Sequence, residues 1–553
     1  MHRRRSPLRP RRAPEPPIRG GQVKRIVIVA TAAIMAAGGA GVAVSANAAT
    51  GPSGAAATKG IDWGKCAVSG PDDPMNNAQC AQVEVPLDHA RPGGRKISIA
   101  VSRFKHTDDK DYKGVLLVNP GGPGGTGIEY APALARWMGG VGHADVAAKY
   151  DIIGFDPRGV GSSKPALTCD PNFSDPIRPD YVPSSWKEEK AWIAKSKKYA
   201  QDCAKKFGWL LPHMRTTDAA RDVDAIRAAL GQQKISWYGF SYGTYFGATY
   251  ATLFPKRVQH MVLDGNVNPK TVWYDAQLEQ DKAFEHNIKA WWAWAAKYDS
   301  VYHLGKSEKA VEAKYYAVRA AAKKTPIAGK IGPDELDDIV LSAGYNTGYY
   351  IPFAEALSAW VNNEDASGLL GWLSAGGDDN SFAVYNAVQA ADARWPRNWS
   401  KWHRDAEKLY KQGYRFNTWS NVWFNAPVAF WPFKGGPEFR LQGSRSLPGM
   451  LLVQSTQDAA TPVAGGLEMH KVFPSSRLVF EVGGKTHANT LNGNACLDDK
   501  VAAYLDTGAL PAGHRGPDAY CKAVPALNDP DPTAMTAKAA RAAAGKDLPV
   551  GRP

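Results

Sequence analysis

Three features that would each indicate a particular class of protein are missing from the sequence. After residue 44, no apolar run is long enough to span a bilayer. After residue 25, no run of Lys and Arg is long enough to follow a phosphate backbone. The cysteines form no C-x-x-C pair and no H-x-x-x-H segment accompanies them. We therefore predict no stable membrane association, no nucleic-acid partner, no metal and no cofactor.

The positive charge of the chain is concentrated at its N-terminus. Residues 1–25 contain nine Lys and Arg against one Glu, so they carry +8 of the formal +14. An uncharged apolar segment follows, and Ala46-Asn47-Ala48 supplies the small residues of a cleavage site. A membrane anchor is the alternative, but no charged stop follows the apolar segment. The layout predicts a secretory signal peptide over 1–48 and a secreted, extracellular protein.

Six cysteines suit the oxidising compartment to which such a signal leads. They can pair in many ways, and the sequence cannot choose among them. Because they fall as three local couples along the chain, we expect disulfides between Cys66 and Cys80, Cys169 and Cys203, and Cys496 and Cys521.

From about Trp63 onward the sequence has the pattern of an α/β protein. Short apolar segments bounded by Gly, Pro or Asp are typical of strands buried on both faces. They occur at 114–119, 150–155, 234–240, 260–265, 449–454 and 477–482. Between the second and third, apolar residues recur at helical spacing, with Thr216 or Thr217 expected to cap the helix and Gly231 to end it. This alternation predicts a doubly wound, mostly parallel sheet of the α/β-hydrolase type.

Residues 266–446 interrupt the alternation of strands and helices. They have the pattern of helices joined by loops and contain 12 of the 18 Trp residues. We expect a large helical cap whose core holds most of these Trp residues, while a few line an apolar pocket. The cap would separate two parts of the hydrolase core, 61–265 and 447–527. Residues 49–60 are expected to be a linker or pro-segment, and 528–553 a peripheral tail.

The segment "GFSYG" places Ser241 between Gly239 and Gly243, after a predicted strand and before a predicted helix. In such a turn the serine takes a strained conformation that exposes its hydroxyl, and small residues let the strand and helix approach. The motif alone occurs by chance, but its position makes Ser241 a candidate nucleophile. Dehalogenase or epoxide-hydrolase chemistry would need an aspartate there.

A serine nucleophile needs a general base and an acid that orients the base, and in this architecture the order is Ser, Asp, His. Asp458 follows the strand at 449–454, and His487 follows the strand at 477–482. Alternatively, Asp458 caps a turn, His487 is a surface residue, and His470 competes for the role of base. Order and strand-end position together favour Ser241, His487 and Asp458 as nucleophile, base and orienting acid.

Backbone N–H groups are needed to stabilise the oxyanion of the reaction. Tyr242 directly follows the candidate nucleophile, and we expect it to supply one donor. The glycine-rich segment "NPGGPGGTG" (119–127) should supply the other, with Gly122 as our candidate. The later segment "GFDPRGVGSS" (154–163) is expected to be a structural turn that supports the site.

Five segments in order resemble a known family: "NPGGPGGTG", "DIIGFDPRGVGSS", "WYGFSYGTYFGATYATLFP", "VLDGN" and "STQDAATP" with a later histidine. Together they resemble the prolyl-aminopeptidase branch of the α/β-hydrolases and, more closely, the secreted tripeptidyl aminopeptidases of actinobacteria. The resemblance covers about residues 60–525. It implies a serine peptidase that releases tripeptides from free N-termini, with Ser241, Asp458 and His487 in the roles given above.

An aminopeptidase of this kind would take peptide or protein N-termini as substrates and bind their α-ammonium group. A carboxylate of the cap would do this, and Glu355, Asp365, Asp379 and Asp392 are candidates of which none is preferred. An esterase or lipase, a prolyl aminopeptidase and a catalytically inactive binding protein are the alternatives. The sequence does not predict an oligomeric state.

Overall fold

The computed structural model describes residues 60–373 and 378–524. The predicted signal peptide and tail, and all but the last residue of the predicted linker, lie outside these residues.

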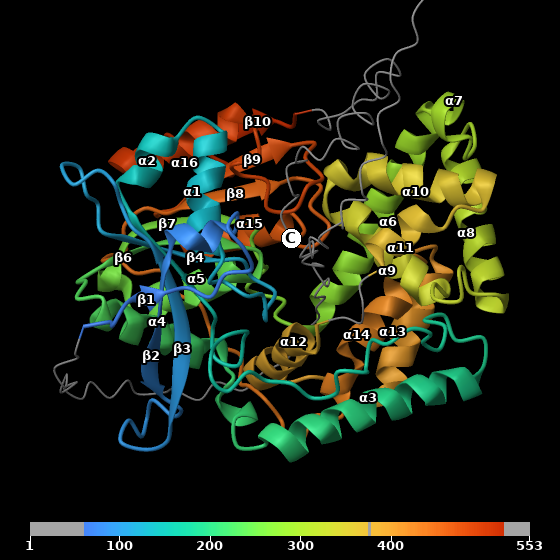
Figure 1. Ribbon diagram of the computed structural model, residues 1–553, viewed down its shortest axis with the longest axis horizontal. Coiled ribbons are helices and arrows are strands. Elements are labelled where there is room, and N and C mark those ends of the chain that lie inside the picture. Colours follow the sequence, from blue (N-terminus) through green and yellow to red (C-terminus); the bar gives the residue numbers. More distant parts are fainter. Residues whose placement is uncertain (1–59, 374–377, 525–553) are drawn as a thin grey trace, which may run out of the picture.

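The described residues contain a ten-stranded sheet in the order β1-β2-β3-β5-β4-β6-β7-β8-β9-β10 (Figure 1). The strands are β1 (Gly64–Lys65), β2 (Gln79–Pro86), β3 (Lys96–Phe104), β4 (Val115–Asn119), β5 (Asp151–Phe155), β6 (Ile235–Phe240), β7 (Val258–Asp264), β8 (Leu451–Ser455), β9 (Arg477–Val482) and β10 (Ala519–Lys522). Pairs from β1 to β5 are antiparallel, and those from β5 through β4 to β10 are parallel. The predicted mostly parallel sheet is confirmed, and the six predicted strand segments match β4 to β9.

Strand residues alternate between two buried faces of the sheet. In β4, Val115 and Leu117 belong to one hydrophobic cluster, whereas Leu116 and Val118 belong to another. The helices α1 (Tyr130–Gly140), α2 (Ala144–Ala148) and α16 (Ala495–Thr507) cover one face, and α4 (Thr216–Ala229), α5 (Tyr242–Leu253) and α15 (Ala464–Val472) cover the other (Figure 1). Burial on both faces explains why these strands are almost continuously apolar in the sequence.

Helix α4 lies where the sequence predicts it, but its N-terminal cap is different. Gly231, with φ of +69°, follows the end of the helix as expected. Neither Thr216 nor Thr217 is the N-cap residue, since both already lie inside the helix. Instead, Asp392 accepts hydrogen bonds from the Thr216 backbone N–H at 2.8 Å and the Thr216 hydroxyl at 2.5 Å. The capping prediction is wrong because a carboxylate from a distant segment satisfies the helix start.

A layer of helices lies beside the sheet, between β7 and β8 in the sequence (Figure 1). It contains α6 (Tyr274–Lys297), α7 (Asp299–Tyr302), α8 (Glu308–Lys324), α9 (Pro333–Tyr345), α10 (Tyr350–Asn363), α11 (Ser367–Trp372), α12 (Asp379–Asp392), α13 (Trp399–Lys411) and α14 (Thr418–Ala429). We call these helices the helical layer. Short 3-10 helices are found at Pro74–Asn77, Leu211–His213, Pro255–Arg257 and Thr347–Tyr349.

An earlier helix also packs against the helical layer. It is α3 (Trp186–Phe207), which lies between β5 and α4 in the sequence. Trp192 of α3 stacks on Trp423 of α14 with ring centroids 5.5 Å apart, and Trp423 in turn stacks on Trp399 and Trp419. Stacked, buried rings of this kind make a hydrophobic core, as expected for most of the Trp residues.

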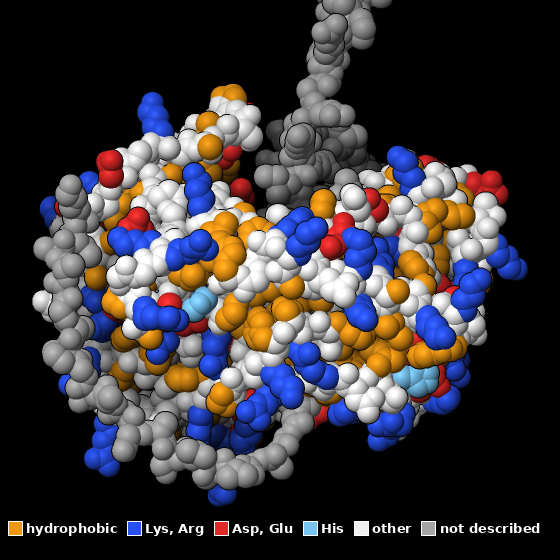
Figure 2. Space-filling view, turned by 90° about the horizontal axis from the view of Figure 1, so that it is seen from below, with side chains coloured by type: hydrophobic (Ala, Val, Ile, Leu, Met, Phe, Trp, Pro, Cys, Tyr) orange, Lys and Arg blue, Asp and Glu red, His pale blue; other side chains and the backbone are white. Residues whose placement is uncertain are grey.

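Disulfides join Cys66 to Cys80, Cys169 to Cys203 and Cys496 to Cys521. In the residues that the structure describes, no helix has the length and apolar character needed to cross a bilayer. Figure 2 shows Lys and Arg side chains at many separate points of one face, with hydrophobic side chains between them.

Candidate active site

Ser241 lies between β6 and α5 in a backbone conformation that residues other than glycine rarely adopt. Its φ is 56° and its ψ is −126°. A Cβ atom on Gly239 would lie 2.3 Å from the Gly243 carbonyl oxygen, and one on Gly243 would lie 2.6 Å from the Asn119 carbonyl oxygen. Side chains at these two positions would therefore push the strand and helix apart. Strain at the serine and small neighbours on both sides are the features that the G-x-S-x-G motif requires.

Asp458 and His487 meet beyond the ends of β8 and β9. The His487 Nδ1 atom lies 2.7 Å from Asp458 Oδ2, and the two side chains are 5% and 0% exposed. Asp458 Oδ1 accepts two backbone N–H bonds of its own turn at 2.9 Å, and the Thr461 hydroxyl donates to Oδ2 at 2.8 Å. The Asp458 carboxylate thus both stabilises its own turn and contacts His487. The competing His470 lies on α15, 2.8 Å from the Ser476 hydroxyl.

The electrostatic setting of His487 favours a proton on its ring. Burial lowers the pKa of the imidazole, but the charge and hydrogen bond of Asp458 outweigh burial and raise the pKa above the ordinary 6.5. The Asp264 carboxylate acts in the same direction. Because Nδ1 donates to Asp458, Nε2 is the ring nitrogen left to exchange a proton with a reacting group.

Ser241 and His487 approach the same strand end, that of β7. The Ser241 backbone N–H donates to the Asp264 carbonyl at 3.0 Å. The next residue, Gly265, lies so close to the imidazole that a Cβ atom there would be 3.0 Å from His487 Cε1. Among the described residues, no hydrogen bond joins the Ser241 hydroxyl to His487. The structure therefore brings Asp458 and His487 into contact and places Ser241 beside the same strand end.

The glycine-rich segment 119–127 packs against the serine turn. A Cβ atom on Gly121 would lie 2.9 Å from Ser241 Cβ and 3.0 Å from the Tyr242 nitrogen, and the φ of Gly121 is +101°. The Asn119 side chain fixes the segment by accepting the Gly121 N–H at 3.1 Å. Within the described part of the chain, neither the Gly122 nor the Tyr242 backbone N–H donates to another protein group. Both predicted oxyanion donors therefore lack a protein acceptor.

The turn after β5 supports the glycine-rich segment. The Asp156 carboxylate accepts the Gly127 N–H at 2.7 Å and the Ser162 N–H at 2.7 Å. Arg158 forms two hydrogen bonds to the Asp222 carboxylate, both 2.7 Å long. These contacts agree with the structural role expected for the turn.

Sequence reasoning missed the contribution of the helical layer to the site. The His487 backbone N–H donates to the Tyr345 carbonyl at 2.7 Å, and the two rings meet edge to face with centroids 5.9 Å apart. The Asn287 amide of α6 donates to carbonyls at the end of α9, in the Asp458 turn and in the His487 loop, at 3.0 to 3.4 Å. An asparagine inside a helix belongs to no motif, so the sequence carried no signal for it.

Asp392 and Asp379, two of the four suggested ammonium ligands, are engaged in holding other parts of the fold. Asp392 holds the start of α4, and Asp379 accepts hydrogen bonds from the Tyr199 hydroxyl and the Cys169 N–H, both at 2.7 Å. Glu355 and Asp365 are exposed. The structure thus gives no reason to assign the ammonium site to any of the four.

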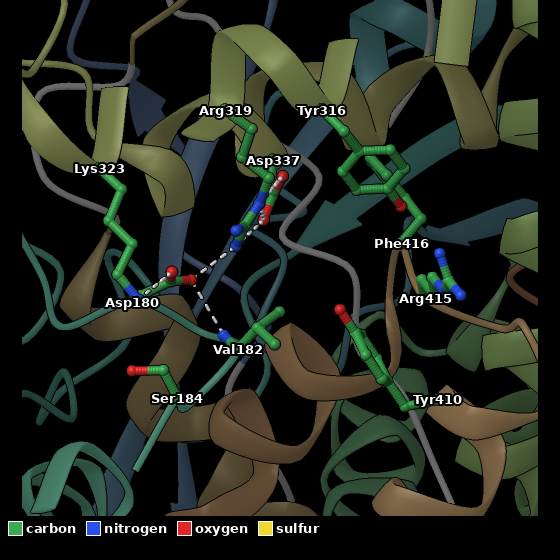
Figure 3. A pocket seen from close by; sticks show the side chains of 10 residues that line it. All are labelled: Asp180, Val182, Ser184, Tyr316, Arg319, Lys323, Asp337, Tyr410, Arg415 and Phe416. Atoms are coloured by element: carbon green, nitrogen blue, oxygen red, sulfur yellow. Dashed lines mark hydrogen bonds and ion pairs between the residues drawn. The ribbon is translucent and has the colours of Figure 1, made fainter. Parts of the chain in front are cut away.

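A separate cavity of about 240 Å³ lies between the segment 180–184, α8, α9 and α13 (Figure 3). The three triad candidates do not line it. Four of its charged side chains pair with one another: Arg319 contacts Asp180 at 2.7 Å and Asp337 at 2.9 Å, and Lys323 contacts Asp180 at 2.8 Å. These ion pairs join the segment 180–184 to the helices, and we assign their side chains no catalytic or binding role.

Two family profiles match the chain. The family described as alpha/beta hydrolase fold matches residues 114–307, and the family described as TAP-like protein matches residues 414–521. The first match contains Ser241 and the glycine-rich segment, whereas the second contains Asp458 and His487.

Curated relatives match over most of the chain. The tripeptidyl aminopeptidases of Streptomyces coelicolor and Streptomyces lividans are 42% identical to it over 471 residues, which is 83% of this chain and 86% of each relative. The serine protease Hip1 of Mycobacterium tuberculosis is 32% identical over 480 residues, covering 82% of this chain and 89% of the relative. The crystal structure of proline iminopeptidase from Mycobacterium smegmatis aligns with 78% of this chain and all of that one, with 14% identity and a TM-score of 0.32.

Proposed function

Because the chain belongs to the tripeptidyl aminopeptidase family of α/β-hydrolases, we propose that it is a secreted serine exopeptidase that releases tripeptides from peptides with a free amino terminus. The observation that carries the proposal is the buried His487–Asp458 pair beside the strained serine turn. Three disulfides support export, since disulfides persist in oxidising compartments.

In the proposed reaction, His487 Nε2 takes the proton of the Ser241 hydroxyl as Oγ attacks the carbonyl carbon of the third peptide bond. Asp458 accepts the hydrogen bond of Nδ1–H and stabilises the imidazolium that forms. The Gly122 and Tyr242 N–H groups bind the oxyanion, and this role is supported because neither group has an acceptor among the described residues.

The tetrahedral intermediate then collapses, the peptide C–N bond breaks, and His487 gives its proton to the leaving amine. Water attacks the acyl-enzyme with His487 again as base, which releases the tripeptide and restores the Ser241 hydroxyl. Because Ser241 precedes the N-terminus of α5, the helix dipole favours the negative charge that develops there.

The test measures release of a chromogenic amine from a tripeptide with a free N-terminus, from its N-acetylated form, and from a short-chain nitrophenyl ester. We expect rapid cleavage of the free tripeptide, much slower but measurable turnover of the acetylated peptide and the ester, and, by mass spectrometry, tripeptides released from longer peptides. Equal turnover of the acetylated peptide or the ester would overturn the exopeptidase proposal in favour of an endopeptidase or esterase. Release of single residues would identify a prolyl aminopeptidase.

The triad is tested separately from the specificity. Ser241→Ala and His487→Ala should abolish both turnover and labelling by a fluorophosphonate, while circular dichroism shows that both variants are folded. His470→Ala is the matched control, because the polar contacts of His470 within the described residues are with Ser476 and Asp518 rather than with the proposed triad. Loss of activity in the control with retention in His487→Ala would contradict the assignment.

A further inference from the structure

Helix α6 carries a buried carboxyl group that lacks a cationic partner. Asp281 is 2% exposed, and within the described residues no Lys, Arg or His forms an ion pair with it. Its Oδ1 atom accepts hydrogen bonds from the amides of Asn421 at 2.5 Å and Asn417 at 3.4 Å. No described donor contacts Oδ2. Burial raises the pKa of Asp281 to about 7, as expected of a carboxylate that the protein does not neutralise.

Asp281 belongs to the part of α6 that packs against the proposed catalytic loops. The neighbouring Gln280 donates to the Ala460 carbonyl, which lies in the turn of Asp458. Phe284, one helical turn further on, packs on Tyr345 with ring centroids 4.8 Å apart. Tyr345 is the residue whose carbonyl accepts the His487 N–H. Asp281 therefore lies within one helical turn of side chains that contact both loops.

Hydrogen bonds continue from Asp281 along α14 to α12. The Asn425 amide donates to Asn421 Oδ1 at 3.2 Å, and the Tyr385 hydroxyl donates to Asn425 Oδ1 at 2.8 Å. All four side chains are buried. Polar groups in such a chain hold fixed positions, because each is oriented by its neighbours.

The far end of this path reaches the glycine-rich segment. Ser381, one turn before Tyr385 in α12, donates its hydroxyl to the Gly124 carbonyl at 3.1 Å. From there to Asp281 the path follows one turn of α12 and one turn of α14, each about 5.4 Å long.

We propose that Asp281 is the carboxylate that binds the α-ammonium group of the substrate, with Asn421 holding it in place. The inference rests on the proposed exopeptidase function and deepens it. An ammonium group supplies both the missing positive charge and the missing donors for Oδ2. Because Asp281 is held in place, its separation from Ser241 also determines how many substrate residues fit between the amino terminus and the cleaved bond. That number is the number of residues released.

The experiment compares wild type with Asp281→Asn, which keeps the shape of the side chain and removes its charge. The substrates are the free and N-acetylated tripeptidyl anilides and the short-chain ester. We expect kcat/KM for the free tripeptide to fall at least about 100-fold, since a buried charge partner is lost. Ester turnover and fluorophosphonate labelling should stay within about threefold of wild type and thus report a folded enzyme with an intact triad. The ratio of free to acetylated turnover should fall toward one.

Asp337→Asn is the matched control. Asp337 is also a buried carboxyl of the helical layer, but it pairs with Arg319 (Figure 3) and accepts a hydrogen bond from the Tyr315 hydroxyl. Removing the Asp337 charge should lower the unfolding temperature and leave the ratio of free to acetylated turnover unchanged. If Asp281→Asn fails to fold, Asp281→Glu keeps the charge, and we expect it to retain the preference for the free N-terminus.

The outcomes separate the two proposals. If wild type prefers the free N-terminus and Asp281→Asn keeps that preference, the ammonium assignment is overturned and the exopeptidase proposal stands. If wild type itself shows no preference for the free N-terminus, the exopeptidase proposal is overturned, and the ammonium assignment that rests on it is overturned as well. If Asp281→Asn loses ester turnover and free-peptide turnover equally, Asp281 only holds α6 to α14, and the ammonium assignment is again overturned.

Discussion

The backbone N–H of His487 and the carbonyl of Tyr345 are joined by a 2.7 Å hydrogen bond, which links the proposed base directly to the end of α9. The next residue, Ala488, has a φ of +52°, an unfavourable conformation for a residue with a side chain. Such strain persists only where surrounding contacts fix the backbone. The geometry of the His487 loop therefore depends on the helical layer.

Asn287→Leu should disturb this geometry. The buried Asn287 amide donates to carbonyls at the end of α9, in the Asp458 turn and in the His487 loop. Leucine at this position would leave all three carbonyls without that donor. We expect stability to fall by about 1–3 kcal/mol. In steady-state assays, kcat should fall at least about tenfold while KM changes less, because the reacting groups are displaced rather than the substrate site.

Asn362→Leu is the control for that substitution. The Asn362 amide also donates to carbonyls in the helical layer, those of Tyr302 and Ser358, but it is exposed and in contact with neither catalytic loop. Its kcat should equal that of wild type. An equal loss of kcat in both variants would show that the effect is a general one on the helical layer.

The pH dependence of activity should follow the raised pKa of His487. A general base must be neutral, so kcat/KM should fall as pH drops, with a midpoint above 6.5. The protonated ring is favoured in the folded state. Its contribution to stability is therefore complete below pH 6.5 and is lost as pH rises through the folded-state pKa. A pH series of initial rates and of unfolding temperatures checks both signs.

Asp458→Asn should reverse the shift in the pKa of His487. Without the carboxylate, burial is the dominant effect, and burial lowers the pKa of an imidazole. The midpoint of kcat/KM should move below 6.5, and kcat should fall by about 10⁴-fold because the ring loses its orienting acceptor. A midpoint that stays above 6.5 would mean that another group sets the profile.

Gly124→Ala should separate the glycine-rich segment from α12. A Cβ atom there would lie 2.5 Å from the Ser381 carbonyl oxygen, and the φ of Gly124 is +106°. Gly142→Ala is the control, because its φ is +91° and no atom lies within 4 Å of the added Cβ. We expect the control to lose about 1–2 kcal/mol of unfolding free energy because of its backbone conformation. Gly124→Ala should lose about 1–3 kcal/mol more because the added methyl group overpacks. Denaturant unfolding measures both, and only Gly124→Ala should lose activity.

Removing the Cys169–Cys203 disulfide should destabilise the protein more than removing Cys66–Cys80. The bonds close loops of 34 and 14 residues, respectively. The free energy of unfolding of each double Cys→Ala variant should fall by about 2–4 kcal/mol. Chain entropy alone makes the fall about 0.8 kcal/mol larger for the longer loop. The Cys66–Cys80 bond joins the residue after β1 to the antiparallel strand β2, away from the proposed site, so its removal should leave kcat unchanged. A larger loss of stability from the shorter loop would contradict the entropic argument.

The sequence predicted the sheet well because the signals for its strands are local. In the segment 114–119, four successive apolar residues lie between Gly114 and Asn119, a pattern typical of a strand buried on both faces. Asp458 and His487 were also predictable, because parallel strands bring their carboxyl ends to one edge of the sheet. The contact between them at 2.7 Å is the outcome of that topology.

Contacts between distant segments were not predictable in this way. Asp392 caps α4, and Asn287 reaches both catalytic loops, although neither residue belongs to a recognisable local pattern. Asp281 likewise looks like any charged residue of a helix until its burial is known. Propensity and periodicity describe one element at a time, whereas these roles arise where two elements pack together.

The hydrogen bond from His487 to the end of α9 also makes the proposed base depend on the packing of the helical layer. A chain whose sheet has formed, but whose long insertion has not yet packed, would carry Ser241, Asp458 and His487 without the contacts that hold the histidine loop. Such a folding intermediate would lack a competent base and could not digest the peptides around it. If hydrolysis needs these long-range contacts, a newly made copy would stay inert until its tertiary structure is complete.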